Sequence, residues 1–202
     1  MDADHTAHPR FSASRAFELN NPFRRLFDRS PQRFIKLLGI EPEWAIIDFG
    51  CGPGFFTIPF AKAAHRVVAV DVQSEMLKKA EAYARKAGAK IELAESDGTA
   101  IPLPSDSFDL IFLNLVYHEI ENKASVLHEF RRLLKLGGKV AIREKTENTL
   151  FPMGPPITPV SQIQDGLEKA GFGDVHTIGG KGNRIVVGIK QNRIPVSGGS
   201  VH

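Results

Sequence analysis

The sequence is poor in cysteine, with Cys51 alone among 202 residues. One cysteine excludes a disulfide within the chain and any metal site built from several cysteines, and we expect no metal ion. No apolar run approaches the roughly 20 residues that a membrane-spanning helix needs. The opening stretch, MDADHTAHPR, lacks the apolar core of a signal peptide. These absences predict a cytoplasmic protein without a membrane span.

Tyrosine, tryptophan and dense charge are also scarce. The chain has 14 Phe against two Tyr and one Trp, and its net charge is only +3. Seven basic residues lie at 10–36, but they are scattered between Phe residues rather than forming a block. This spacing favours the solvated face of helices over a nucleic-acid interface, although RNA stays open as an alternative partner. The length suits one domain with a full core.

A short apolar run at 45–49 predicts a buried strand, and three glycines follow it at alternate positions. Glycine lets the backbone turn tightly and lets a ligand approach where a Cβ would collide. A second apolar run ends in Asp71. That residue lies about 20 positions beyond the loop, where α/β nucleotide sites place a carboxylate on ribose hydroxyls. The segment therefore predicts a site for an adenosine-containing cofactor.

The glycine spacing distinguishes between such cofactors. A dinucleotide site uses G-x-G-x-x-G. Counted from Gly50, the third glycine position of that pattern is held by Phe55. The pattern present is D-x-G-x-G-x-G, with Gly54 one residue too early. An NAD-dependent oxidoreductase is therefore disfavoured.

From residue 45 onward, strand-like and helix-like segments alternate, which predicts a parallel sheet with helices on both faces. We expect strands at 45–49, 66–71, 90–94, 108–113, 139–144, 174–178 and 184–190, and helices at 56–64, 74–87, 123–135 and 159–170. The last two strands are joined by a connection too short for a crossover helix, so we expect an antiparallel hairpin there. The fold class is therefore α/β, with a seven-stranded, mostly parallel sheet.

The remaining segments give the expected domain organisation. We expect a disordered tail at 1–10, a small N-terminal helical cap or lid at 11–40, the cofactor-binding domain at 41–190 and a flexible tail at 191–202. Ser30 and Pro31 suit the start of a helix, and Gly39 suits its end. Ser74 similarly suits the N-cap of the helix at 74–87.

Several motifs resemble one enzyme family. Residues 48–54 resemble the first motif of class I S-adenosylmethionine (SAM)-dependent methyltransferases, and LPSDSFD at 103–109 is similar to the family's L-P-F-x-D-x-S-F-D entry to strand 4. LLKLGG at 133–138 resembles its L-K-P-G-G turn, with Leu136 where proline is usual. From about residue 31 to 190 the chain is similar to the methyltransferase type 11 group, which includes quinone-biosynthesis methyltransferases. The resemblance implies a Rossmann-like three-layer sandwich, with SAM as methyl donor and S-adenosyl-L-homocysteine as product.

The resemblance also implies the cofactor-binding residues. The glycine loop would pass beneath the methionine part of SAM, Asp71 would bind the ribose diol, and Asp97 would accept from the adenine amino group. The full expected set is Asp48, Gly50, Cys51, Gly52, Gly54, Asp71, Val72, Gln73, Met76, Asp97, Gly98 and Asn114. Simpler roles compete with some of these, since Met76 suits plain core, Cys51 a small space-filler and Asp97 the cap of a turn.

The resemblance says less about chemistry at the acceptor. His118 and Glu144, ahead of Glu119, are the expected candidates for a general base, which matters only if the acceptor must lose a proton. Ordering of the loop is the simpler role that competes for His118. Phe residues at 11–27 and the proline-rich stretch 151–157 are expected to wall the acceptor pocket, which favours a small, partly apolar molecule. An RNA or protein methyltransferase and a SAM-binding regulatory module without turnover are the alternatives. The identity of the acceptor, the atom that receives the methyl group, and the choice between monomer and homodimer stay open.

Overall fold

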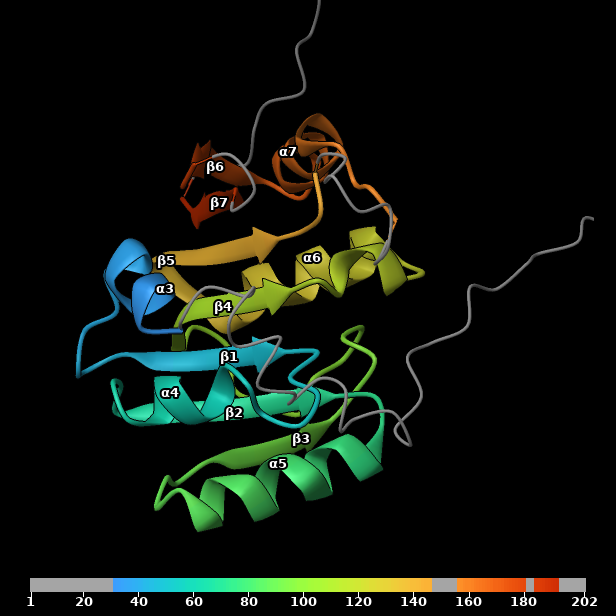
Figure 1. Cartoon of the computed structure of the whole chain (residues 1–202). Helices are drawn as coiled ribbons and strands as arrows, with labels where there is room; N and C mark the ends of the chain where they lie inside the picture. Colours follow the sequence, from blue (N-terminus) through green and yellow to red (C-terminus); the bar gives the residue numbers. More distant parts are fainter. Residues whose placement is uncertain (1–30, 147–155, 181–183, 193–202) are drawn as a thin grey trace, which may run out of the picture.

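The computed structural model describes residues 31–146, 156–180 and 184–192. Seven strands form one sheet in the order β3-β2-β1-β4-β5-β7-β6 (Figure 1). The pairings from β3 to β5 are parallel, whereas β7 runs antiparallel to both β5 and β6. This confirms the α/β sandwich with a C-terminal antiparallel hairpin. Ser30 and the parts of the expected cap and tails at 1–30 and 193–202 lie outside the described residues.

The strands alternate with helices along the chain. The strands are β1 Ala45–Phe49, β2 Arg66–Asp71, β3 Glu92–Glu95, β4 Phe108–Asn114, β5 Leu134–Arg143, β6 Phe172–Ile178 and β7 Ile185–Lys190. The helices are α3 Pro31–Leu38, α4 Thr57–Ala61, α5 Ser74–Lys86, α6 Lys123–Leu133 and α7 Val160–Lys169, with a 3-10 turn η2 at Tyr117–Glu119. In the described ranges, no helix is long and apolar enough to cross a bilayer, and no group of three or more His, Cys, Asp or Glu side chains is placed to hold a metal ion.

Helices cover both faces of the sheet because successive strand residues point to opposite sides. On β1, Ile46 packs with α3 and α4, whereas Ile47 packs with α6 and α7 on the other face. On β2, Ala69 packs with α5, which therefore lies on the same face as α4. The structure is thus a three-layer sandwich with its core on both sides of β1 and β4 (Figure 1).

Four buried Phe rings, Phe34, Phe56, Phe60 and Phe112, pack together on the face of the sheet that α3 and α4 cover. The ring centroid of Phe56 lies 5.2 Å from that of Phe34 and 4.9 Å from that of Phe112. The ring centroids of Phe60 and Phe112 are 5.3 Å apart. Edge-to-face and tilted packing of this kind adds to the free energy of apolar burial. Through Phe34 and Leu38, both buried, helix α3 belongs to the packed core of the sheet.

Several element boundaries differ from the sequence prediction. Helix α4 covers only Thr57–Ala61, and α6 ends at Leu133 because the chain there already enters β5. The LKLGG segment is an irregular start of that strand, with a register shift between Phe108 and Leu110 of β4. The N-cap of α5 is Gln73, not Ser74, and it makes no side-chain capping bond. Gly39 does end α3, with a φ of +62°.

Candidate functional site

The carboxyl ends of parallel strands meet at one edge of a sheet, and ligands of open α/β sheets bind there. The predicted residues follow four neighbouring strands at this edge. The glycine loop follows β1, Asp71 ends β2, Asn114 ends β4, and Glu144 follows β5. The parallel register of these strands places their four carboxyl ends side by side at this edge.

The glycine loop adopts a backbone that other residues rarely take. Gly50, Gly52 and Gly54 have φ values of +67°, +51° and +88°, in the left-handed region that glycine enters without steric cost. The N–H groups of Gly50 and Cys51 donate to the carbonyl of Val70, at 2.8 and 3.1 Å. The loop is therefore fastened to β2 and exposes backbone where a ligand can approach. Cys51 itself is buried, as its expected space-filling role requires.

Asp71 shapes the same loop through its carboxylate. Oδ2 accepts the Gly52 N–H at 2.9 Å, and Oδ1 accepts the Gln73 N–H at 3.0 Å. Burial raises the pKa of Asp71, and these backbone bonds lower it in part. Each carboxylate oxygen can accept a second hydrogen bond, so the group fits the two hydroxyls of a ribose. Beside it, Val72 is 39% exposed and Met76 is buried on α5.

Asp97 and Gly98 form a turn after β3. Asp97 Oδ1 accepts from the Thr99 N–H at 2.9 Å and from the Thr99 hydroxyl at 2.7 Å. Gly98 has a φ of +92°, and a Cβ there would lie 2.7 Å from the ring of Phe49. Asp97 thus caps this turn, which the sequence had offered as its simpler role. Contact of Asp97 with adenine stays a prediction.

Asp48 and Thr57 join the end of β1 to the start of α4. The Thr57 hydroxyl donates to Asp48 Oδ2 at 2.5 Å, and Asp48 is only 3% exposed. Burial raises the pKa of Asp48 to about 7, although the bond from Thr57 opposes the shift. The carboxyl group therefore orders the loop through the helix that follows it. Sequence reasoning missed Thr57, whose signal is a hydroxyl residue at the first helical position after the glycines.

This buried carboxyl group predicts a pH-dependent stability. The unfolded chain releases the Asp48 proton near pH 4 and the folded chain only near pH 7, so folding weakens as pH rises between those values. We expect the free energy of unfolding to fall from about pH 5 to about pH 8 by about 2–3 kcal/mol more in the wild type than in Asp48→Asn. Urea denaturation at both pH values measures this difference. Asp165→Asn, at an exposed position of α7, is the control. If the free energy of unfolding depended equally on pH in wild type and Asp48→Asn, Asp48 would not have the raised pKa.

Asn114 has a partner that the sequence did not reveal. Arg143, at the end of β5, donates from Nη1 to Asn114 Oδ1 at 2.7 Å. The guanidinium carbon lies 5.3 Å from the ring centroid of Phe34. A buried arginine therefore lies at the carboxyl ends of β4 and β5, beside the predicted methionine end of the cofactor. Its position follows from the sheet register, which one sequence does not display.

The two candidate bases, His118 and Glu144, are in direct contact. His118 Nδ1 lies 3.0 Å from Glu144 Oε2, and the His118 backbone N–H donates to Glu144 Oε1 at 3.3 Å. The Glu144 side chain has no exposed surface, and that of His118 is 13% exposed. Burial lowers the pKa of His118, but the negative charges of Glu144 and Glu119 outweigh it and leave the pKa above its usual value.

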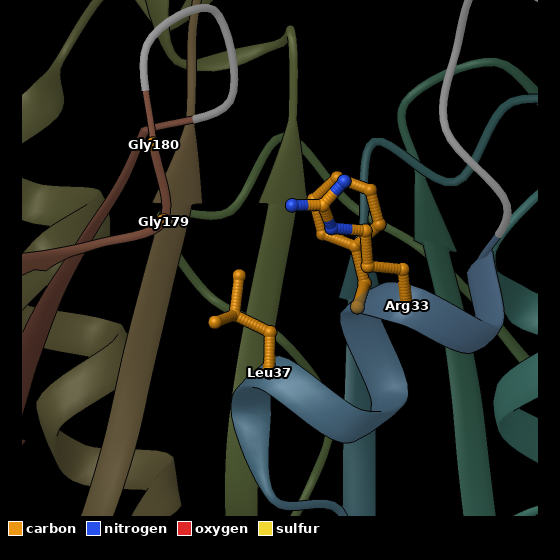
Figure 2. Close-up of a pocket in the computed structure, with 5 residues that line it drawn as sticks. Arg33, Leu37, Gly179 and Gly180 are labelled. Atoms are coloured by element: carbon orange, nitrogen blue, oxygen red, sulfur yellow. The ribbon is translucent and has the colours of Figure 1, made fainter.

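A hollow lies near the same edge, between α3 and the β6–β7 hairpin. It measures about 270 Å³ including open solvent and is lined by Arg33, Phe34, Leu37, Gly179 and Gly180. In Figure 2, Arg33 and Leu37 project from α3 on the side that faces the two glycines. Since the start of β7 pairs with the end of β5, this hollow opens beside the strand that leads to Glu144.

Comparison with known proteins finds similarity to methyltransferases. The Methyltransf_11 family, described as "Methyltransferase domain", matches residues 47–142. A malonyl-[acyl-carrier protein] O-methyltransferase of Yersinia pestis is 29% identical over 70% of this chain and 51% of its own length. A ubiquinone/menaquinone biosynthesis C-methyltransferase of an Enterobacter species is 26% identical over 81% of this chain and 65% of its own. The chain thus spans about half to two thirds of these relatives.

A solved structure extends the likeness over the whole fold. The crystal structure of a SAM-dependent methyltransferase from Aquifex aeolicus is 28% identical, with a TM-score of 0.81. The match covers 90% of this chain and all of that one. The glycine loop and Asp71 lie within residues 47–142, the region that the family model matches.

Proposed function

The chain belongs to the type 11 group of class I SAM-dependent methyltransferases, and we propose that it transfers the methyl group of SAM to a small, partly apolar molecule and releases S-adenosyl-L-homocysteine. The observation that carries the proposal is the glycine loop closed onto Asp71, which offers bare backbone beside a carboxylate. When bound, SAM supplies a methyl group on a positively charged sulfur that departs as a neutral thioether.

The residues of the chain position the reactants and exclude water. Asp71 would hold the ribose by charge-assisted hydrogen bonds, and Val72 would offer apolar surface to the adenine. Asn114, kept in place by Arg143, would lie at the methionine end. Holding donor and acceptor in line removes much of the entropic barrier to transfer. A general base is needed in addition only if the acceptor must lose a proton.

The nature of the acceptor is the finer part of the proposal. The relatives are named as methyltransferases of malonyl-[acyl-carrier protein], of ubiquinone/menaquinone biosynthesis and of phosphoethanolamine. For this chain we propose a small molecule held between residues 11–27, the hollow beside α3, and the stretch 151–157. Residues 11–30 and 151–155 lie outside the described residues, whereas Ile157 is 41% exposed. The proposal includes a cytoplasmic location, where a single cysteine stays reduced.

Two measurements test the function. Calorimetry should show binding of SAM and S-adenosylhomocysteine and none of NAD; the opposite pattern would refute the cofactor.

Tritiated SAM is then incubated with the protein and a deproteinised small-molecule extract, with total RNA, or with extract protein. Label in the small-molecule fraction supports the proposal. Label in RNA with a steep salt dependence, or in protein, would favour those alternatives, and binding without any transfer would favour a regulatory module.

A further inference from the structure

The turn after β4 is held in an unusual conformation close to the glycine loop. Leu115 has a φ of +58°, which a non-glycine residue seldom adopts. Its N–H donates to the carbonyl of Arg143 at 2.8 Å. The next side chain, Val116, lies so close to Gly50 that a Cβ on that glycine would be 2.5 Å from it. A strained backbone that several surrounding contacts hold in place is common at active sites. Here these contacts fix η2 beside the proposed SAM site.

Glu144 fixes the ring of His118 on this turn. Its carboxylate accepts the His118 backbone N–H and contacts the ring at Nδ1. A carboxylate can only accept, so Nδ1 carries the proton in the neutral ring. Nε2 is then left with a lone pair and no proton. The arrangement therefore sets one tautomer, with the basic nitrogen directed away from Glu144.

The charges around this ring favour its uptake of a proton. Glu119 Oε1 lies 3.7 Å from Nε2, and Glu144 lies on the other side of the ring. Lys123 opposes them, but its ammonium is turned to the Ile120 carbonyl at 2.6 Å and lies 5.4 Å from the ring centroid of Tyr117. Tyr117 itself packs against Gly166 of α7. An imidazolium at position 118 is thus stabilised by carboxylates on both sides.

We propose that His118 Nε2 is the general base of methyl transfer, that Glu144 is the residue that positions it, and that the acceptor is therefore a protic nucleophile, an O–H or acidic C–H group. The inference rests on the proposed function. The Nε2 lone pair removes the acceptor's proton, and the electron pair of that bond forms the new bond to the methyl carbon. The electron pair of the breaking carbon–sulfur bond goes to sulfur. The proton on Nε2 later passes to water, so the step needs no oxidant or reductant.

Ring spectroscopy tests the geometry without an acceptor. The chain has seven histidines, and His118→Gln identifies the signal of position 118 in ring ¹H–¹⁵N spectra of the full chain, recorded from about pH 5.5 to about pH 9 with and without S-adenosylhomocysteine. We expect the Nδ1–H tautomer in the neutral ring, and in Glu144→Gln a lower pKa and a mixture of tautomers. A neutral ring protonated at Nε2 would overturn the proposal.

The role of His118 in catalysis is tested by measuring turnover, with the small-molecule fraction that tritiated SAM labels as the source of acceptor. His118→Gln should lower kcat by about 100-fold or more, while the Kd for S-adenosylhomocysteine stays within about threefold of the wild-type value. In Glu144→Gln the rise of kcat with pH should move to lower pH, because removal of the negative charge lowers the pKa of the base. His128→Gln, at an exposed position of α6, should change neither kcat nor its dependence on pH.

Two results of this assay would overturn the proposal. One is a His118→Gln variant that keeps its rate within about threefold of wild type. The other is a product methylated on a tertiary amine or a thioether, which has no proton to lose. Failure of the proposed function looks different, because the wild type itself would then bind no SAM or label no small molecule. In that case the ring spectra alone decide whether His118 has the tautomer of a base.

Discussion

Asp71→Ala is expected to raise the Kd for S-adenosylhomocysteine by about 30- to 1000-fold, equivalent to about 2–4 kcal/mol. The substitution removes the carboxylate that would bind the ribose diol. It also frees the N–H groups of Gly52 and Gln73, which the carboxylate now holds at 2.9 and 3.0 Å. Loss of ligand contacts and loss of loop order therefore act in the same direction. Isothermal titration calorimetry of the folded variant measures the change.

A second aspartate provides a matched control for this experiment. Asp109 Oδ2 accepts the Ala45 N–H at 2.7 Å, and the carboxylate also pairs with Lys135. Ala45 begins β1, so Asp109 lies at the opposite edge of the sheet from the glycine loop. Asp109→Ala should reduce the free energy of unfolding and leave the Kd unchanged. If Asp71→Ala also left the Kd unchanged, the ribose would have been assigned to the wrong residue.

The fold was largely predictable because the signals for it are local. Strands β1 and β2 have the predicted ends, since each is an apolar run bounded by turn residues. The hairpin of β6 and β7 followed from a connection too short for a helix. The start of β5 was not predictable in this way, because the LKLGG sequence is typical of the end of a helix followed by a turn. Its pairing with Phe108 makes it part of the strand, and that pairing is a non-local contact.

For the candidate site, the sequence indicated individual residues but not the contacts between them. The spacing of the glycines and Asp71 indicates their roles, whereas Thr57 and Arg143 act through partners 9 and 29 positions away in the sequence. The contact of His118 with Glu144 spans 26 positions. It depends on a turn that begins with a leucine of positive φ, which no propensity would indicate.

Gly50→Ala is expected to lower the free energy of unfolding by about 2–5 kcal/mol, through two separable effects. The first is conformational, because Gly50 has a φ of +67°. The second is steric, since the added methyl group would lie 2.5 Å from Val116 Cγ2. Gly39→Ala isolates the first effect: Gly39 has a φ of +62°, and a Cβ there meets nothing within 4 Å. That control should lose only about 1–2 kcal/mol.

The steric part is measured by adding Val116→Ala to Gly50→Ala. The smaller side chain makes room for the new methyl group, so the double variant should be more stable than the sum of the single changes predicts, by about 1–2 kcal/mol. Urea denaturation of the four proteins gives this coupling energy. Additive effects, with Gly50→Ala no worse than Gly39→Ala, would show that Val116 does not press on the glycine loop. The turn carrying His118 would then lack its contact with the SAM site, and the base proposed there would lose its place in the mechanism.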